Sequence, residues 1–348
     1  MNRQTQDVGT GGFAIQSGEN TNIAIHGGVS PEQMSEIMVA IAKTVVSFTD
    51  AAFDKAQREM NAFREEVLKR FAQPGKANPE AFKDPDFQYM LNDAQKAVAR
   101  SGDPEVRDTL VDLIARRSLE TSRTRLAINL AEAATKVANL TADEFAALSL
   151  SYLVRYTINH GIGNIQQLGD LIQNQLVPFA KNVSREQASF WHLQAQSCAN
   201  IEMGALDLLT ALRRNYSGVL SEGFTREELQ NHLPDGKKNA LDQWVIPCLN
   251  DNATLQFQFL NVQAFKEATA QSGLSDNELQ NAWNLLEGRT HNARERINSV
   301  APDADIVFDA WENTLLPKLS LTSLGIAIGH ANATRIVGLN APLGIWIK

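Results

Sequence analysis

The sequence predicts a mainly α-helical protein: a multi-helix domain with an N-terminal β-hairpin and long helix, and a small α+β C-terminal tail. Apolar residues recur every three or four positions through most of the chain, and capping residues precede many of these runs. Short alternating runs occur in the opening stretch and after residue 250. We expect a disordered segment over 1–10, an oligomerisation region over 11–73, a linker over 74–85, a helical domain over 86–250 and an α+β domain over 251–348.

The opening stretch GGFAIQSGENTNIAIHGG predicts the hairpin. Apolar residues alternate with small or polar ones in FAIQ and again in NIAI, which is the period of a strand. Gly18 and Asn20 between the two runs tolerate the positive φ of a tight turn. Because a lone two-stranded hairpin is marginal in water, its apolar face must lie on the rest of the fold or pair with another chain.

A long helix is predicted directly after the hairpin, over residues 31–73. Ser30 can cap it, Pro31 suits the first helical position, and Gln33 suits the capping box. A helix of this length would reach about 60 Å at 1.5 Å per residue. Part of its apolar stripe therefore meets another chain or folds back at a kink. We favour homo-oligomerisation, and the alternative is a hairpin that caps its own helical domain; the residues expected to carry the assembly are Phe13, Ile15, Ile23, Ile25, Ile37 and Ile41.

Prolines and a glycine in QPGKANPEAFKDP predict a break in the chain over 74–85. Apolar periodicity then predicts helices over 86–100, 104–137, 142–160, 164–178, 184–216, 225–232 and 237–249. A short strand is expected where Leu255, Phe257 and Phe259 alternate with polar residues, and another helix over 275–298. The last residues, Gly344 to Lys348, read as a strand in the α+β tail.

The composition excludes some classes of function. With 32 Lys and Arg against 40 Asp and Glu, the formal charge is -8 and the basic residues are scattered, so we expect no general nucleic-acid binding. The best membrane candidate, over 319–347, carries His330 and Arg335 near its middle and predicts no membrane span. Cys198 and Cys248 lie in apolar patterns and no secretion signal is evident, so we expect a cytoplasmic protein.

Three pieces of the chain resemble an uncharacterised family of bacterial proteins. They are QSGENTNIAIHGGVSPEQMSEI near the start, DPDFQYMLNDAQKAVARSGDPEVRDTLVDLIARRS in the middle, and LTSLGIAIGHANATRIVG followed by LGIWI at the end. The family has no assigned activity to carry over. Relatives of the opening motif resemble segments in front of varied bacterial domains, some in phage-defence gene neighbourhoods, and LTSLG is also similar to the strand-to-helix edge of winged-helix domains.

The most specific catalytic hypothesis concerns RYTINH, Arg155 to His160. Arg followed by His after four residues resembles the signature of HEPN ribonucleases, all-helical dimers in which the His acts on the ribose 2'-hydroxyl and the Arg steadies phosphate charge. Tyr156 departs from that signature, which usually has a polar residue there. REELQNH, from Arg226 to His232, is a second and looser match, so the simpler interpretation of Arg155 and His160 is a helix end with a surface His.

The remaining histidines predict no metal site and no cofactor. His192 precedes Cys198 by six residues, a spacing that puts the two on different faces of a helix. His26, His291 and His330 have no second ligand at a metal-binding spacing. Our leading hypothesis is therefore a self-assembling scaffold or sensor of a bacterial cell, with phage defence as a candidate setting and a protein of unknown identity as a candidate partner. The alternative is a HEPN-like, metal-independent ribonuclease acting as a dimer.

Overall fold

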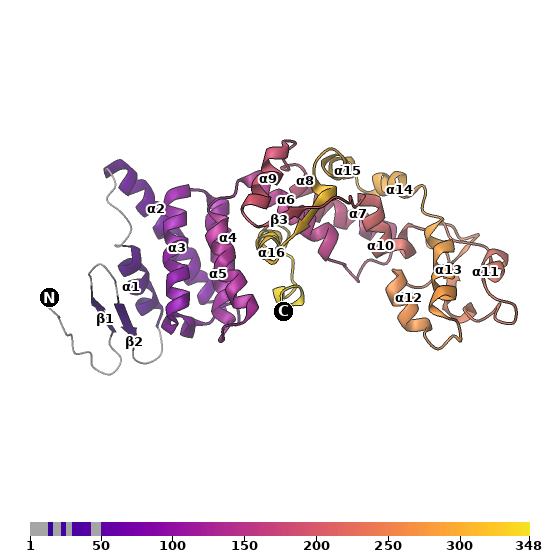
Figure 1. The fold of residues 1–348 in the computed structure, drawn as a ribbon, viewed down its shortest axis with the longest axis horizontal. Helices are drawn as coiled ribbons and strands as arrows, with labels where there is room; N and C mark the ends of the chain where they lie inside the picture. Colours follow the sequence, from indigo (N-terminus) through magenta and orange to yellow (C-terminus); the bar gives the residue numbers. More distant parts are fainter. Residues whose placement is uncertain (1–12, 17–21, 26–29, 43–49) are drawn as a thin grey trace. The chain divides into compact units, whose positions relative to one another are not determined.

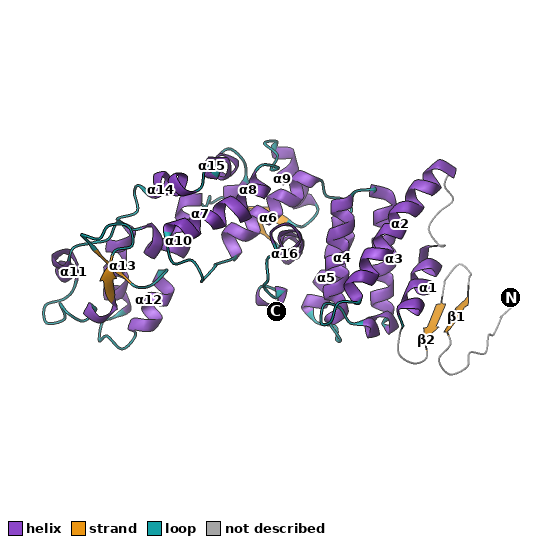
Figure 2. Cartoon of the chain, turned by 180° about the vertical axis from the view of Figure 1, so that it is seen from behind, coloured by secondary structure: helices purple, strands orange, loops and turns teal. Residues whose placement is uncertain are grey.

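The protein is mainly α-helical, as the sequence predicts. The computed structural model describes residues 13–16, 22–25, 30–42 and 50–348, and the chain divides into two compact units. Unit 1 comprises residues 1–149, 192–199 and 321–348, and unit 2 comprises residues 150–191 and 200–320. Figure 1 colours the chain along its sequence, and Figure 2 separates helices from strands.

Unit 1 is built mainly from helices. Its elements are β1 (Phe13–Gln16), β2 (Asn22–Ile25), α1 (Pro31–Ala42), α2 (Asp50–Phe71), η1 (Pro79–Lys83), α3 (Pro85–Ser101), α4 (Pro104–Leu119), α5 (Arg125–Val137), α16 (Ser323–Val337) and η5 (Leu343–Ile345). Four further elements contain residues of both units: α6 (Ala142–Tyr156), α9 (Gln187–Ala195), β3 (Ala199–Ile201) and β6 (Leu319–Leu321).

Strands β1 and β2 form an antiparallel pair. Phe13 pairs with Ile25, and Ile15 pairs with Ile23. The residues that join the two strands lie outside the described part of the chain. The pair is a two-stranded sheet, so among the described residues neither outer edge bonds to a third strand.

The helix predicted over 31–73 is two helices, α1 and α2, with residues 43–49 between them outside the described part. The two helices pack against each other, which a single straight helix through both could not do. Helix α1 also packs on α3, where the buried side chain of Gln95 donates a hydrogen bond to the carbonyl of Met38 at 3.3 Å. The sequence left two explanations for the apolar stripe: contact with another chain, or folding back at a kink. Since α1 packs on α2 and α3, its apolar face is explained by folding back.

Helices α2, α3, α4 and α5 pack side by side in unit 1, and α16 packs on α4 and α5 (Figures 1 and 2). Asp-Pro pairs start α3 and α4, because Asp84 and Asp103 each cap a helix whose first residue is proline. A buried carboxylate then joins three of the helices. Asp112 of α4 pairs with Arg70 of α2 and with Arg116, whose guanidinium also donates to Thr334 of α16.

The single helix predicted over 104–137 was wrong, because the chain breaks between α4 and α5. Thr124 caps α5 by accepting the N–H of Ala127 at 3.0 Å. Neither Gly nor Pro marks the break, so the apolar period runs through it in the sequence. The Arg117 side chain, 4% exposed, stabilises the end of α4 by donating to the carbonyl of Glu120 and pairing with Asp84 and Asp86.

Unit 2 contains helices and short strands. Its elements are α7 (Ile165–Leu171), the π-helical turn η2 (Ile172–Leu176), α8 (Val177–Ala180), α10 (Leu208–Leu220), α11 (Arg226–His232), η3 (Asp242–Trp244), β4 (Val245–Pro247), β5 (Leu255–Phe257), α12 (Val262–Thr269), α13 (Asp276–Glu287), α14 (Ala293–Val300), α15 (Ala304–Glu312) and η4 (Leu316–Lys318). Strand β3 pairs with β6, and β4 with β5.

Three more predicted helices were wrong. The helix predicted over 275–298 is two helices, α13 and α14. Residues 184–216 contain α9, β3 and the start of α10, because a turn through Ser197, with φ at +61°, ends the first helix and Asp207 caps the last. Residues 237–249 contain η3 and β4 in place of a helix. In the register of the β4–β5 pair, Val245 is opposite Phe257.

An aromatic core holds residues 224–286 of unit 2 together. Phe257 stacks at 4.5 Å from Phe265 and 6.0 Å from Trp283, measured between ring centroids, and Phe224 lies 5.0 Å from Phe257. All four side chains are at most 1% exposed. Figure 2 shows the β4–β5 pair beside α13, which carries Trp283.

The strand predicted over 344–348 was wrong. The segment begins with η5, which Pro342 precedes, and the N–H of Trp346 donates to the carbonyl of Leu343 at 3.0 Å. Leu343 and Ile347 are buried within unit 1. The apolar residues of this segment are therefore removed from water without pairing as a strand.

Candidate functional site

Arg155 lies in the last turn of α6 and is engaged by its own chain. Its guanidinium donates to the carbonyls of Leu316 at 3.2 Å and Pro317 at 2.5 Å, and lies 5.6 Å from the ring centre of Trp311. Burial lowers the pKa of Arg155 below its usual value. These contacts give the guanidinium the role of holding the 316–317 turn in unit 2.

His160 lies beyond the helix that was expected to carry it. Helix α6 ends at Tyr156, and His160 is exposed in the following turn. The N–H of Asn159 donates to the hydroxyl of Tyr216, which fixes this turn to α10. Arg155 and His160 are therefore positioned by different contacts, on a helix end and on a loop.

The residues predicted to carry oligomerisation divide into two groups. Ile37 is fully buried in unit 1, where α1 packs on α2 and α3. The backbones of β1 and β2 are described, but the side chains of Phe13, Ile15, Ile23, Ile25 and Ile41 lie outside the described part of the structure.

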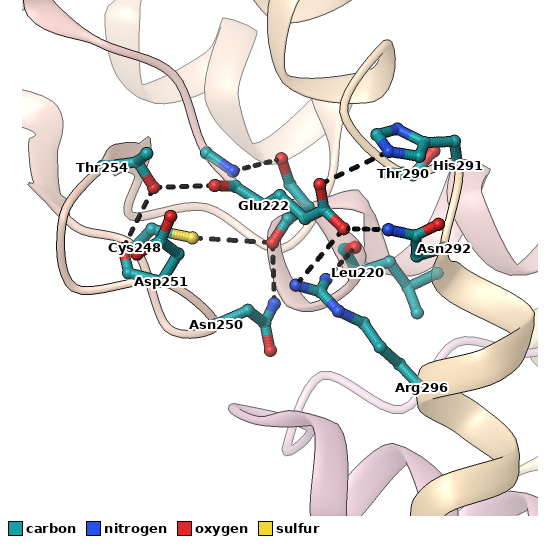
Figure 3. Close-up of polar contacts among 12 residues, drawn as sticks. Leu220, Glu222, Cys248, Asn250, Asp251, Thr254, Thr290, His291, Asn292 and Arg296 are labelled. Atoms are coloured by element: carbon teal, nitrogen blue, oxygen red, sulfur yellow. Dashed lines mark hydrogen bonds and ion pairs between the residues drawn. The ribbon is translucent and has the colours of Figure 1, made fainter.

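Glu222 is the centre of the polar contacts drawn in Figure 3. Its carboxylate accepts a hydrogen bond from Asn292 at 2.8 Å and lies 3.5 Å from the His291 ring and 3.9 Å from Arg296. The Glu222 and His291 side chains are 28% and 62% exposed. The Glu222 carbonyl also accepts the Thr254 hydroxyl at 2.7 Å.

The backbone around Glu222 joins four segments of unit 2. Arg296 donates to the Leu220 carbonyl at 2.9 Å, Asn250 donates to the Ser221 carbonyl at 2.7 Å, and the Glu222 N–H donates to the Arg289 carbonyl at 2.9 Å. Gly223 follows with φ at +78°, and a Cβ there would collide with Thr254. The cluster therefore joins the aromatic core region to α14. The exposed His291 ring lies 3.5 Å from the Glu222 carboxylate, a long distance for an ion pair.

A second carboxylate–imidazole pair lies in unit 1 and is much tighter. The Nδ1 atom of His192 lies 2.6 Å from the Oε1 atom of Glu144, and the Glu144 side chain is only 2% exposed. The other oxygen, Oε2, accepts the N–H of Thr141 at 2.9 Å, at the N-terminus of α6. A buried carboxylate satisfied on both oxygens holds the His192 ring in one orientation.

Donors are arranged around the other ring nitrogen of His192. The side-chain amide of Gln196 lies 3.3 Å from Nε2, and Asn139 donates to the Gln196 oxygen at 3.3 Å. Because the Gln196 oxygen accepts from Asn139, its NH2 group is the one that faces the ring. The chain of donors runs from Asn139 through Gln196 to His192 and ends on Glu144, which places the proton on Nδ1 and leaves Nε2 as the acceptor.

Cys198, which the sequence places near His192, is not a nucleophile here. Burial raises the pKa of its thiol to about 12; the nearby charge of Lys136 acts in the opposite direction and that of Glu144 in the same direction. At neutral pH the thiol stays protonated. Its backbone has the structural role, because the Cys198 carbonyl accepts the N–H and the hydroxyl of Thr322.

Helix α16 supports the turn that follows His192. Thr322 also donates to the carbonyl of Ser197, the residue with positive φ. At Gly325 any Cβ would collide with the Cys198 carbonyl, so only glycine lets α16 come this close to the turn. The strained turn is therefore held from outside, as backbone strain at a positioned site requires.

Metal-ligand clusters and membrane-spanning helices are both absent from the described residues. Within residues 13–16, 22–25, 30–42 and 50–348, no group of three or more His, Cys, Asp or Glu side chains is placed to hold a metal ion. Among the helices of that same part, none is both long and apolar enough to span a bilayer.

Comparison with known proteins adds a family but no activity. The model of an uncharacterised family matches residues 28–347, and the chain belongs to that family. No curated protein and no solved structure matches the chain.

Sequence reasoning missed the Glu144–His192 pair. The two residues are 48 positions apart and come from different helices, so no local spacing marks them. One local signal is the capping box at Thr141 and Glu144, which gives a hydrogen-bond partner to only one of the two carboxylate oxygens. The other is His192 itself, a half-exposed histidine in α9 to which the sequence assigns no role.

Proposed function

We propose that the protein is a self-assembling scaffold or sensor of a bacterial cell, and that copies associate through β1 and β2. The observation that carries this proposal is the isolated two-stranded sheet, whose outer edges bond to no third strand among the described residues. An open strand edge is a template for pairing with another chain. A two-stranded sheet gains its stability from further contacts, and a second copy supplies them.

The composition of the two strands supports the same proposal. The register pairs Phe13 with Ile25 and Ile15 with Ile23, so the four large apolar residues occupy alternate rungs of the ladder. Since Ile37 is buried within unit 1, the association rests on the strands and not on that face of α1.

The experiment that tests assembly is the mass of the full chain in solution by light scattering. We expect the wild type to be an oligomer and both the chain lacking residues 1–30 and the double variant Ile15→Asp/Ile23→Asp to have a lower mass. The matched control is Ala14→Asp/Ala24→Asp, which adds the same charges on the neighbouring rung of the ladder and is expected to keep the larger mass. An unchanged mass after the deletion would remove the proposal.

A cytoplasmic location and a role in phage defence belong to the same proposal. Both cysteines are buried free thiols, which suits a reducing compartment. The defence setting rests on the resemblance of the opening motif to segments found in such gene neighbourhoods. Plaque counts on cells that express the wild type or the Ile15→Asp/Ile23→Asp variant test it: we expect protection by the wild type alone, and equal counts in both would argue against it.

A further inference from the structure

The His192 ring has the features of an imidazole prepared for nucleophilic attack. The Glu144 carboxylate, 2.6 Å from Nδ1, holds the proton on that nitrogen, so the lone pair is on Nε2. An imidazole with its N–H bonded to an anion is a better nucleophile at the other nitrogen. The His192 side chain is 41% exposed, so a reagent in solution can reach the ring.

The groups near Nε2 suit a phosphoryl group. The Gln196 amide, 3.3 Å from Nε2, can turn its N–H groups to an oxygen of a newly attached group. Amide donors stabilise phosphoryl oxygens as charge develops on them. A metal ion has no comparable ligand set in the described residues.

We propose that His192 is a phosphoryl acceptor, modified at Nε2 by a donor that carries phosphate on nitrogen, a phosphoramidate. In the transfer, the Nε2 lone pair forms a bond to phosphorus while the P–N bond of the donor breaks. The leaving nitrogen keeps the bonding pair and departs as a neutral base, because it already carries its proton in the donor. No atom is oxidised or reduced.

Glu144 accounts for the charge that the step creates. The ring becomes positively charged as Nε2 is phosphorylated, because Nδ1 still carries its proton. The carboxylate that already accepts this N–H stabilises the charge, and its position on the buried end of α6 keeps it in place. Glu144 is thus a positioning residue, and His192 the residue that reacts.

The test is incubation of the folded full-length protein with potassium phosphoramidate at neutral pH. We expect one phosphoryl group by intact mass, lost in acid, and mapped to His192 by fragmentation. His192→Gln should abolish it. The matched control is His160→Gln, which removes another exposed imidazole and should leave the modification unchanged.

Glu144→Gln separates positioning from folding. It keeps the shape of the side chain, and we expect modification to slow about 10-fold or more, as for loss of other orienting partners of a reactive imidazole. The 15N spectrum of His192 reports the tautomer independently, and it should lose its preference for the Nδ1–H form in this variant. Circular dichroism checks that each variant is folded.

Two results would overturn the proposal. One is the absence of phosphate on His192 in the folded wild type, which needs no variant. The other is equal labelling of His160, His232 and His291, which would make His192 no different from a surface imidazole. Neither result bears on assembly through β1 and β2, so the two proposals fail separately.

Discussion

Two carboxylate–imidazole pairs in this protein differ in how firmly each holds its histidine. In unit 2, Glu222 is 28% exposed and lies 3.5 Å from His291, and it shares its carboxylate with Asn292 and Arg296. In unit 1, Glu144 is 2% exposed and lies 2.6 Å from His192. The comparison teaches that burial of the carboxylate, more than the presence of the pair, decides whether a histidine has one tautomer and one orientation.

The difference arises from what surrounds each pair. Glu144 occupies the third position of α6, where the backbone of Thr141 binds its second oxygen, and α16 holds the turn after His192. Glu222 lies on a loop and spreads its contacts over several partners. The buried Glu144 carboxylate at the start of α6 therefore orients the His192 ring. The Glu222 carboxylate, on a loop, instead joins neighbouring segments of the chain.

The strongest way to break the tight pair is to push α16 away from it. Gly325→Ala should lower the free energy of unfolding by about 3 kcal/mol, because the new methyl meets the Cys198 carbonyl and backbone has to move. Chemical denaturation measures it. Gly338→Ala, at the residue that caps the C-terminus of the same helix, is the control: its φ is +67° but nothing lies within 4 Å, so we expect a loss of only about 1 kcal/mol. Equal losses would show that the close approach of α16 is unimportant.

Removing the buried carboxylate comes next. Glu144→Ala should cost about 2 to 3 kcal/mol, since it removes a helix cap and a hydrogen bond to a charged group. Denaturant titration gives the change. A loss below about 0.5 kcal/mol would contradict the picture of a buried, doubly bonded carboxylate.

A third histidine, His330, is buried and is held neutral by its surroundings, which extends the comparison of the two pairs. Burial, and then the charge of Arg116, lowers the pKa of His330 from 6.5 to about 4, and the ring lies 2.7 Å from the Ala341 carbonyl. The unfolded chain therefore binds the proton more tightly, so this contribution to stability is complete above pH 6.5 and is lost as the pH falls toward 4.

Between pH 7.5 and pH 5 the His330 contribution should fall by about 2 kcal/mol. Denaturation of the wild type and of His330→Gln at both pH values measures it, and the variant should show the smaller pH dependence. His160→Gln, a change at an exposed imidazole, serves as the control and should behave as the wild type. If the free energy of unfolding of His330→Gln keeps the pH dependence of the wild type, that dependence comes from other groups.

The loose pair should give the smallest effect. Glu222→Ala is expected to cost about 1 kcal/mol or less, because its partners remain partly hydrated. Added salt should weaken the difference further, as it does for exposed charges. If Glu222→Ala costs as much as Glu144→Ala, then exposure does not separate the two pairs.

Much of the helical architecture was predictable from local signals. Asp-Pro starts, the Thr225 capping box and the apolar period place α3 and α11 within a residue or two of their observed bounds, and they place the start of α4 but not its end. Two of the failures share one cause. The break before Thr124 and the turn at Ser197 contain no Gly or Pro at the turning residues, so nothing local interrupts the period.

The candidate site was predictable only in part. His192 and Cys198 are six residues apart in the sequence, and that spacing alone predicts that they do not share a metal ion. The partner of His192 is Glu144, 48 residues earlier, and the strained turn is held by Thr322, more than 120 residues later. Such contacts depend on how helices pack, which periodicity does not encode.

The sequence by itself determined the class of this protein: a mainly helical chain with apolar faces, capped helix starts and an N-terminal pair of strand-forming runs. These features are local, because capping, turn preference and side-chain period act within a few residues. Tertiary structure alone decided that α1 folds against α2, that Arg155 binds the chain's own carbonyls, and that Glu144 faces His192. The reason is that burial and long-range hydrogen bonding depend on which surfaces meet, and many pairings satisfy the same local pattern.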